Sequence, residues 1–326
     1  MGTLTPVISV KALRRNFEVD KKSKGFINQI RSVFHPERTI VKALDGIDFA
    51  VFKGETIGLL GPNGAGKSTT IKILTGILMP TSGVATVNGI EPHRNRTHNA
   101  KKFGVVFGQR TQLWWNLPVR DSFKLLKTIY DIPETTYQRN LSILSKDFEI
   151  DGFIDTPVRQ LSLGQRMRVE IAASVLHNPD ILYLDEPTIG LDILAKDKIR
   201  NFIKKLNEHF GVTIILSTHD LQDVEMLCRR IILINRGAVI YDGELERIKR
   251  QFGKEKTLMI DCDEHIANFN WEGVTGIKEI GTKKYITFTA DIISPTQLIE
   301  KLSKMVNVKD FALQEIELGA VIKRFY

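Results

Sequence analysis

A glycine-rich octapeptide is the segment of this sequence whose residue types and spacing point most directly to chemistry. Its residues are Gly61, Pro62, Asn63, Gly64, Ala65, Gly66, Lys67 and Ser68. Two glycines with four residues between them, followed by Lys and Ser, form the pattern of a phosphate-binding loop. Glycine permits backbone angles that side chains forbid, so successive N–H groups can point at phosphate oxygens. Lys67 would place its charge at the β- and γ-phosphates of a nucleotide, and the Ser68 hydroxyl would ligate Mg²⁺.

The sequence on either side of this loop agrees with that chemistry. The apolar run Thr56–Leu60 predicts a buried strand that enters the loop, and Lys67–Thr75 predicts a helix that leaves it, with Gly76 as its C-cap. Thr69, in the first turn of the helix, is a further candidate for nucleotide binding. A helix N-terminus favours anions and would add to the phosphate site. A glycine turn that precedes a lysine by chance needs neither element, so we favour the phosphate loop.

Two adjacent acids, Asp185 and Glu186, follow a second apolar run, Ile181–Leu184. If this run is a strand of a parallel sheet, both carboxylates lie at the carboxyl edge of the sheet, beside the phosphate loop. Asp185 would then be a Mg²⁺ ligand, and Glu186 would orient and deprotonate an attacking water. Two acids that merely end a strand at the surface are the ordinary alternative. The phosphate loop upstream favours the catalytic interpretation.

Short apolar runs alternate with helical patterns from Thr56 to Arg236, the order expected of strands and helices that wind a parallel sheet. The predicted core strands are Thr56–Leu60, Val105–Phe107, Ile181–Leu184, Val212–Leu216 and Ile231–Ile234. The runs that suggest an antiparallel side sheet are Val7–Phe17, Ile40–Phe52 and Val84–Val87. Residues 119–160 are mostly helical. The predicted fold class is therefore α/β, a phosphate-loop NTPase core with a parallel sheet, an antiparallel β side sheet and a helical subdomain at about residues 110–178.

The strand and helix patterns restart after Gly253. A run at Thr257–Cys262, an alternating strand at Tyr285–Thr289 and a helix opening at Ser294 predict a small α/β appendage. We therefore expect two domains, a nucleotide-binding domain at residues 1–253 and a C-terminal accessory domain at residues 254–326.

Composition and charge exclude some functions. The chain of 326 residues is 42% hydrophobic and contains no run of 18 apolar residues, so we expect it not to cross a bilayer itself. Met1–Val10 lacks the features of a secretory signal, which favours the cytosol. Cys228 and Cys262 show neither a pairing pattern nor metal-ligand spacing, and we expect two reduced core thiols. The net charge of +8 suits nucleic acid, an anionic membrane surface or a polyphosphate ligand, and does not choose among them.

A helix is predicted to begin at Leu161-Ser162-Leu163-Gly164-Gln165, upstream of the two acids. Together with the phosphate loop and the acids, this segment resembles the signature sequence of the ATP-binding cassette (ABC) family. The resemblance covers roughly residues 7–245 and includes Gln109 after the Val105–Phe107 strand. It also includes the turn Gly190-Leu191-Asp192 after the acids, and His219 after the Val212–Leu216 strand.

This resemblance implies a head-to-tail dimer, a homodimer or pseudo-dimer, in which each ATP lies between the phosphate loop of one subunit and the signature helix of the other. Ser162, Gly164 and Gln165 would then contact the nucleotide held by the partner, and Asp192 would cross the interface. The physical argument agrees, because the helix N-terminus at Ser162 is an anion site that its own chain does not need. Leu163 stands where the family usually has the first of two glycines, which would affect fine contacts and rate.

The resemblance also assigns roles around the reacting phosphate. His219 would hydrogen-bond the γ-phosphate and support Glu186, although a lone histidine is more often a capping or core residue. Gln109 would ligate the metal and link the metal and the water to the membrane partner. Phe17 fits the aromatic residue that stacks on adenine, with Phe26 or Phe34 as substitutes, and a plain core role for Phe17 is an equal alternative. ATP and Mg²⁺ are the expected cofactors, and ATP hydrolysis coupled to transport the expected activity.

The stretch from Gly108 through Trp114 and Trp115 to Pro118 looks like ATPases that serve drug, viologen or sodium exporters. We therefore expect an exporter subunit that works with separate membrane permease subunits at the cytoplasmic face of the cell membrane. Those subunits would select the substrate. The alternative is a soluble cassette ATPase of translation or DNA repair. Such proteins carry tandem cassettes or a long coiled coil, whereas this chain shows one cassette and no heptads, so we expect no nucleic-acid partner.

An insertion at residues 18–39 interrupts the family-like course of the chain. Phe26, Ile30 and Phe34 fall on one helical face with basic residues nearby, which predicts a short basic amphipathic helix. It could dock on an anionic leaflet or on a membrane subunit, or it could pack on the side sheet of the cassette.

Overall fold

The computed structural model describes residues 5–20, 38–108, 110–252, 255–266, 270–315, 318–323 and 325. The chain forms two compact units, Met1–Gly243 and Glu244–Tyr326. Gln109 and the amphipathic helix predicted within the insertion lie outside the described residues. No helix in the described part of the chain is long and apolar enough to span a membrane.

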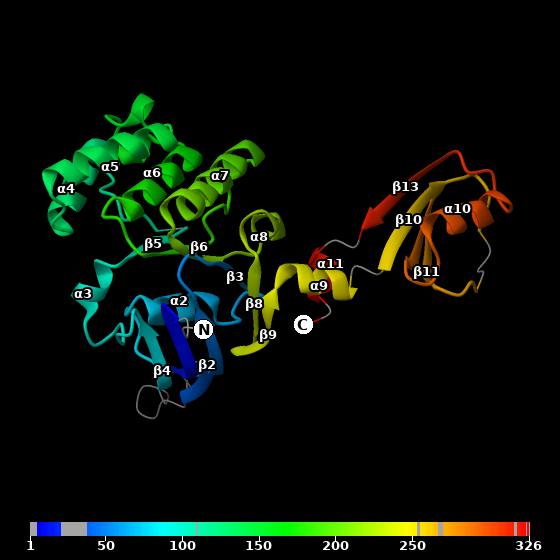
Figure 1. Ribbon diagram of the computed structural model, residues 1–326, viewed down its shortest axis with the longest axis horizontal. Coiled ribbons are helices and arrows are strands. Elements are labelled where there is room, and N and C mark those ends of the chain that lie inside the picture. Colours follow the sequence, from blue (N-terminus) through cyan, green and yellow to red (C-terminus); the bar gives the residue numbers. More distant parts are fainter. Residues whose placement is uncertain are drawn as a thin grey trace, which may run out of the picture. The chain divides into compact units, whose positions relative to one another are not determined.

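The first unit is built on a six-stranded sheet with the order β5-β6-β7-β3-β8-β9 (Figure 1). The strands are β3 (Thr56–Leu60), β5 (Phe103–Phe107), β6 (Ile181–Asp185), β7 (Thr213–Ser217), β8 (Arg230–Asn235) and β9 (Ala238–Glu244). The strands from β5 to β8 pair in parallel. The five predicted core strands and their parallel arrangement are thus confirmed, because strands covered on both faces read as continuous apolar runs.

The predicted side sheet is also confirmed. It has three antiparallel strands in the order β2-β1-β4, with bounds β1 (Ile8–Asp20), β2 (Arg38–Val51) and β4 (Ser82–Val87). The β1–β2 ladder runs on to the pair Asp20 and Arg38, so both ends of the predicted insertion are strand. Helix α2 (Lys67–Leu74) contacts both sheets, and its buried Ile71 and Leu74 belong to the apolar cluster that joins them.

Helices between β5 and β6 form a layer of their own, drawn in green in Figure 1. They follow the short helix α3 and comprise α4, α5, two 3₁₀ turns and α6. The bounds are α3 (Arg96–Ala100), α4 (Val119–Ile129), α5 (Glu134–Asp147), η1 (Asp151–Phe153), η2 (Val158–Gln160) and α6 (Leu163–Val175). After β6 come α7 (Ile193–Phe210) and, beyond β7, α8 (Leu221–Leu227). In the chain order, α6 comes directly before β6, the strand that leads to the two acids.

The second unit is a small antiparallel sheet with one helix over its apolar face. Its sheet has the order β11-β12-β10-β13, and α10 packs on it through Leu298 and Leu302. The bounds are α9 (Leu245–Phe252), β10 (Glu255–Asp261), β11 (Val274–Ile280), β12 (Lys283–Thr289), α10 (Pro295–Ser303), β13 (Asp310–Glu315) and α11 (Leu318–Lys323). The chain passes from the first unit to the second after Gly243, ahead of the boundary predicted after Gly253, because α9 packs against α11 within the second unit. Cys228 and Cys262 are free and buried, as expected.

Candidate functional site

The phosphate loop joins β3 to α2 as predicted. Gly66 is the N-cap of α2 and has a left-handed backbone with φ of 114°. A Cβ atom at this position would lie 2.6 Å from the Ala43 carbonyl oxygen, so only glycine fits. Gly64 also has a positive φ, 81°. The loop therefore takes its shape from glycine, and α2 directs its N-terminal N–H groups and positive dipole end toward the loop.

The side chain of Lys67 folds back onto this loop. Its ammonium group donates hydrogen bonds to the carbonyl oxygens of Gly61, at 2.7 Å, and Pro62, at 3.2 Å. Burial lowers the pKa of Lys67, while the nearby Glu186 and Asp185 carboxylates act in the opposite direction. An incoming polyphosphate would favour the charged amine further. The loop thus holds a desolvated cation beside the two acids.

The sheet order explains why these groups meet. Strands β6, β7 and β3 are neighbours and run in parallel, so the residues that follow them share one edge of the sheet. Asp185 is the last residue of β6, and it pairs with Ser217 of β7. The phosphate loop follows β3. The Glu186 loop, the His219 loop and the phosphate loop are therefore brought together from three distant parts of the chain.

Glu186 and His219 form a close pair at this edge. His219 Nδ1 lies 2.7 Å from Glu186 Oε2. The Glu186 side chain is 20% exposed and that of His219 is 60% exposed, so the pair opens to solvent on the histidine side. Glu186 has a positive φ of 57°, which is rare for a residue other than glycine, and its N–H donates to the Ser217 carbonyl at 2.8 Å. Backbone strain of this kind clusters at active sites and ligand clamps.

The side chain of Asp185 is suited to binding a magnesium ion together with a nucleotide. Its Oδ1 atom is buried and, in the described part of the chain, has no hydrogen-bond partner. A buried carboxylate oxygen without a hydrogen-bond partner is a natural ligand for a water molecule or a metal ion. Ser68 follows Lys67 in the first turn of α2 and supplies a second oxygen, and Mg²⁺ usually binds through one or two protein oxygens together with phosphates. The described residues include no cluster of three or more His, Cys, Asp or Glu side chains that could hold a metal without a nucleotide. The donor set fits Mg²⁺ bound with a nucleotide.

The signature segment lies at the start of α6. Ser162 is the N-cap, and a reciprocal capping box joins it to Gln165: Gln165 N–H donates to Ser162 Oγ at 3.2 Å, and Ser162 N–H donates to Gln165 Oε1 at 2.9 Å. A hollow of about 340 Å³ lies at this helix end. Its lining includes Ser162, Leu163, Gly164, Gln165, Gly190, Leu191 and Asp192. None of the residues 61–68 lines it, so the signature segment and the phosphate loop of one chain face separate spaces.

Two predicted site residues remain outside this arrangement. Gln109 is not among the described residues. Phe17 lies on β1, half-buried, with the Arg15 guanidinium 4.6 Å from its ring centroid, so one face of the ring is already covered by a cation. Stacking on adenine at the other face stays a prediction.

Sequence reasoning missed a polar network behind the Glu186–His219 pair. Asp223 of α8 is fully buried and accepts hydrogen bonds from Thr188, Thr218 and Arg200. The only sequence signal was Thr188, two residues after Glu186, and Thr218, directly before His219, and isolated threonines carry no pattern.

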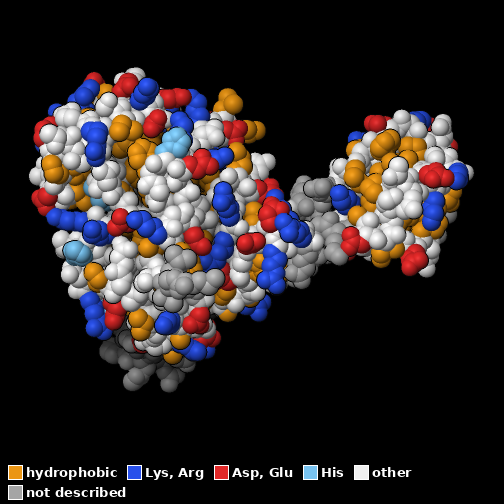
Figure 2. Space-filling model, in the orientation of Figure 1, with side chains coloured by type: hydrophobic (Ala, Val, Ile, Leu, Met, Phe, Trp, Pro, Cys, Tyr) orange, Lys and Arg blue, Asp and Glu red, His pale blue; other side chains and the backbone are white. Residues whose placement is uncertain are grey.

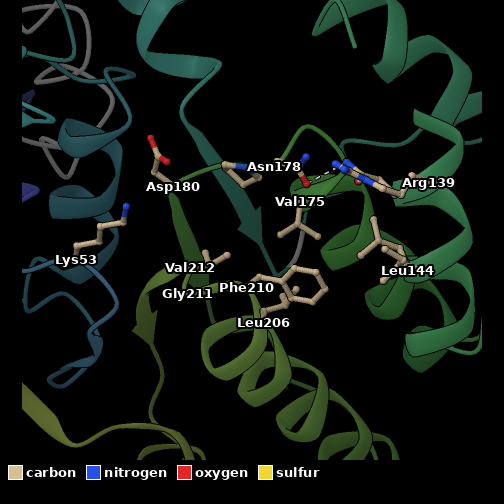
Figure 3. A pocket seen from close by; sticks show the side chains of 13 residues that line it. Lys53, Arg139, Leu144, Val175, Asn178, Asp180, Leu206, Phe210, Gly211 and Val212 are labelled. Atoms are coloured by element: carbon tan, nitrogen blue, oxygen red, sulfur yellow. Dashed lines mark hydrogen bonds between the residues drawn. The ribbon is translucent and has the colours of Figure 1, made fainter. Parts of the chain in front are cut away.

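A larger hollow, about 500 Å³, lies at the opposite edge of the same sheet (Figure 3). Lys53, Asp180 and Val212, which line it, come just before β3, β6 and β7. None of the predicted site residues lines this hollow, and the groups suited to chemistry gather at the carboxyl edge instead.

Comparisons with known proteins agree with this geometry. Residues 44–189 match the family model described as ABC transporter. The ABC transporter ATP-binding protein NatA of Bacillus subtilis is 34% identical over 66% of this chain and 87% of NatA. The Nod factor export ATP-binding protein I of Ralstonia nicotianae is 33% identical over 74% of this chain and 68% of its own length.

An importer subunit and a solved structure are similar as well. The methionine import ATP-binding protein MetN of Halalkalibacterium halodurans is 29% identical over 82% of this chain and 85% of MetN. A dimeric post-hydrolysis structure of an ATP-binding cassette, bound to ADP and Pi, is 27% identical with a TM-score of 0.60, and the match covers 73% of this chain and 98% of that one. With the phosphate loop, the two acids, His219 and the signature helix all in place, this chain belongs to the ABC transporter ATP-binding protein family.

Proposed function

We propose that this chain binds and hydrolyses ATP with Mg²⁺ and so drives a transporter whose membrane part consists of separate subunits. The observation that carries the proposal is the 2.7 Å contact between His219 and Glu186 at the sheet edge that also holds Lys67 and the unpartnered Asp185 oxygen. A base, its orienting partner, a phosphate cradle and a metal-side carboxylate are the parts that phosphoryl transfer to water requires.

In the proposed reaction the residues have separate roles. The N–H groups of the phosphate loop and the Lys67 ammonium hold the β- and γ-phosphates. Glu186 accepts a proton from the attacking water as the water oxygen bonds to the γ-phosphorus and the bond to the bridging oxygen of ADP breaks. His219 orients Glu186 and donates to the γ-phosphate. Bound Mg²⁺, held by Asp185 and Ser68, would neutralise the charge that develops on the phosphate oxygens.

The arrangement favours a shared site between two subunits. The hollow at Ser162 and Asp192 contains a helix N-terminus suited to an anion, yet no residue of its own phosphate loop lines it. A second copy arranged head to tail would place its bound γ-phosphate there. The dimeric cassette structure with ADP and Pi supports this proposal by similarity.

The transport direction that we propose is export. It rests on the likeness of the Gly108–Pro118 stretch to exporter ATPases and on the Nod factor export relative, whereas the methionine import relative shows that similarity alone leaves direction open. Trp114 and Trp115 in this stretch are 37% and 47% exposed, and an exposed aromatic pair suits contact with a membrane subunit at the cytoplasmic face.

A role with nucleic acid is less well supported. On the face of the molecule in Figure 2, Lys and Arg side chains lie among Asp and Glu side chains and do not form one continuous basic surface. Nucleic-acid binding usually depends on such a surface.

The proposed function is tested with Glu186→Gln. The amide keeps the shape of the side chain but cannot act as a base, so we expect ATP affinity within about twofold of wild type and a loss of turnover of at least 10²-fold. Mg-ATP hydrolysis and nucleotide binding are measured on the full chain, with Glu208→Gln, a change at an exposed position of α7, as control. Wild-type turnover in the Glu186→Gln protein would contradict the assigned role.

A further inference from the structure

We infer that Asp223 is a positioning residue that holds the Glu186 loop and the His219 loop at a fixed separation. The inference rests on the proposed function and assigns a role to buried residues that contact neither nucleotide nor metal in that proposal. The juxtaposition is specific: Thr188 lies two residues after Glu186, Thr218 directly precedes His219, and one carboxylate oxygen binds both hydroxyls.

The contacts of Asp223 are well defined. Thr188 Oγ1 donates to Asp223 Oδ2 at 2.5 Å, and Thr218 Oγ1 donates to the same oxygen at 3.2 Å. Arg200 Nε donates to Asp223 Oδ1 at 2.6 Å. Asp223, Thr188 and Thr218 are at most 1% exposed, and Arg200 is 2% exposed. Water therefore does not compete for these bonds, and a buried network whose partners are all satisfied keeps one geometry.

The Thr218 hydroxyl extends the network to the His219 loop itself. It also accepts a hydrogen bond from Asp220 N–H, at 2.9 Å, so the backbone on both sides of His219 is tied to Asp223. On the other loop, Thr188 lies in the turn that leads from Glu186 to Asp192. The backbone bond from Glu186 N–H to the Ser217 carbonyl joins the two turns at their base, and the Asp223 carboxylate bridges them beyond that bond.

A second set of ion pairs connects this bridge to α7. Lys196 Nζ donates to Asp220 Oδ2 at 2.6 Å, and Arg200 Nη2 lies 3.4 Å from the same oxygen. Asp192 caps the N-terminus of α7 through a 2.8 Å bond from Ala195 N–H. In the proposed dimer Asp192 crosses the interface. The start of α7 is joined to Asp220 through Lys196, and Arg200 joins Asp220 to Asp223 and so to the loops of the Glu186–His219 pair. A shift of α7 on dimer closure would therefore change the positions of Glu186 and His219 through these contacts.

Stability alone is the competing explanation, because any broken buried network destabilises a fold. The two explanations differ in what happens well below the melting temperature. If the bonds only stabilise, variants that remain folded should turn over at the parental rate. If they position the pair, turnover falls while nucleotide affinity is kept, since misplacement by about 1 Å can cost up to 10²-fold in rate.

The test uses the full chain with the double variant Thr188→Val/Thr218→Val, which removes both hydroxyls at nearly constant volume. We expect kcat to fall by roughly 10- to 100-fold with ATP affinity within about twofold. The conservative double variant Thr188→Ser/Thr218→Ser keeps the hydroxyls and should retain most of kcat. Thr213→Val is the matched control, because it removes a buried hydroxyl that accepts from Gly54 N–H at the opposite edge of the sheet.

A second readout does not depend on turnover. In the nucleotide-free chain, ¹⁵N NMR of the His219 imidazole reports the hydrogen bond at Nδ1, which is expected in the wild type and the serine variant and lost in the valine variant. Valine variants that keep both wild-type kcat and the Nδ1 signal would overturn the inference, as would serine variants that lose as much as valine variants. A wild-type chain with an intact Nδ1 signal but no Mg-ATP hydrolysis would instead count against the proposed function.

Discussion

His177 carries an acid-sensitive part of the stability of the first unit. The ring stacks on Tyr130 with centroids 4.0 Å apart, and its Nε2–H donates to the Phe103 carbonyl at 3.1 Å. Nδ1 is buried and has no hydrogen-bond partner among the described residues. Burial lowers the pKa of His177 from 6.5 to about 4, and the bond to Phe103 offsets this only in part. The fold therefore holds the neutral ring.

The sign and size of the effect follow from linkage. The folded pKa is lower than the unfolded one, so this contribution to stability is complete above about pH 6.5 and is lost as the pH falls toward 4. At about pH 5 the unfolded chain is almost fully protonated at this residue and the folded chain is mostly not, which costs about 2 kcal/mol of unfolding free energy. That is a large share of the stability of an ordinary domain.

The assay is urea unfolding of wild type and His177→Phe at about pH 7.5 and about pH 5, followed by circular dichroism. Phenylalanine keeps the stacking and cannot titrate, so the variant should lose about 2 kcal/mol less than wild type between the two pH values. His98→Gln, at an exposed position of α3, serves as the control and should behave as wild type. Equal losses in wild type and His177→Phe would refute the reasoning.

Three further outcomes test the nucleotide site. Lys67→Ala should weaken ATP binding roughly tenfold or more, because a charge-assisted contact is worth about 1.5–3 kcal/mol, and tight binding in a fluorescent-nucleotide titration would argue against the cradle. Gly66→Ala should lower the unfolding free energy by at least about 1–2 kcal/mol in urea, since its φ is 114° and its Cβ would meet Ala43, whereas Gly152→Ala has open space and should not. In mixed dimers, a Ser162→Arg subunit paired with a Lys67→Ala subunit places both lesions in one site, so one site should still occlude nucleotide; loss at both would contradict the shared geometry.

Local elements of the site could be predicted because they depend on nearby residues. The strand predicted at Thr56–Leu60 has the same bounds as β3, and the predicted helix after it is α2. The helix predicted to open at Ser294 in the second unit is α10, with Ser294 as its N-cap in a capping box with Gln297. Strand, turn and cap each arise from residue types within a few positions of one another, so one sequence carries the full signal.

Other elements gave too weak a signal. Strands β11 and β13 were not predicted, and they lie at the two edges of the small sheet. The apolar residues of β11 are three positions apart and do not alternate, and Phe311 and Leu313 of β13 are exposed. The domain boundary was predicted after Gly253, which separates α9 from α11. These two helices come from the first and last segments of the second unit, and they pack together in the structure.

The sequence by itself determined the chemical parts of this protein: a glycine-shaped phosphate loop, two acids at a strand end and a capped signature helix. Only the tertiary structure decided that Glu186 and His219, 33 positions apart in the chain, lie 2.7 Å from each other, and that Asp223 joins the loops that carry them. The reason is physical. Residue type and spacing govern local backbone choices, whereas the neighbours of a side chain across a sheet edge follow from strand order, which arises when buried apolar faces pack together over the whole chain.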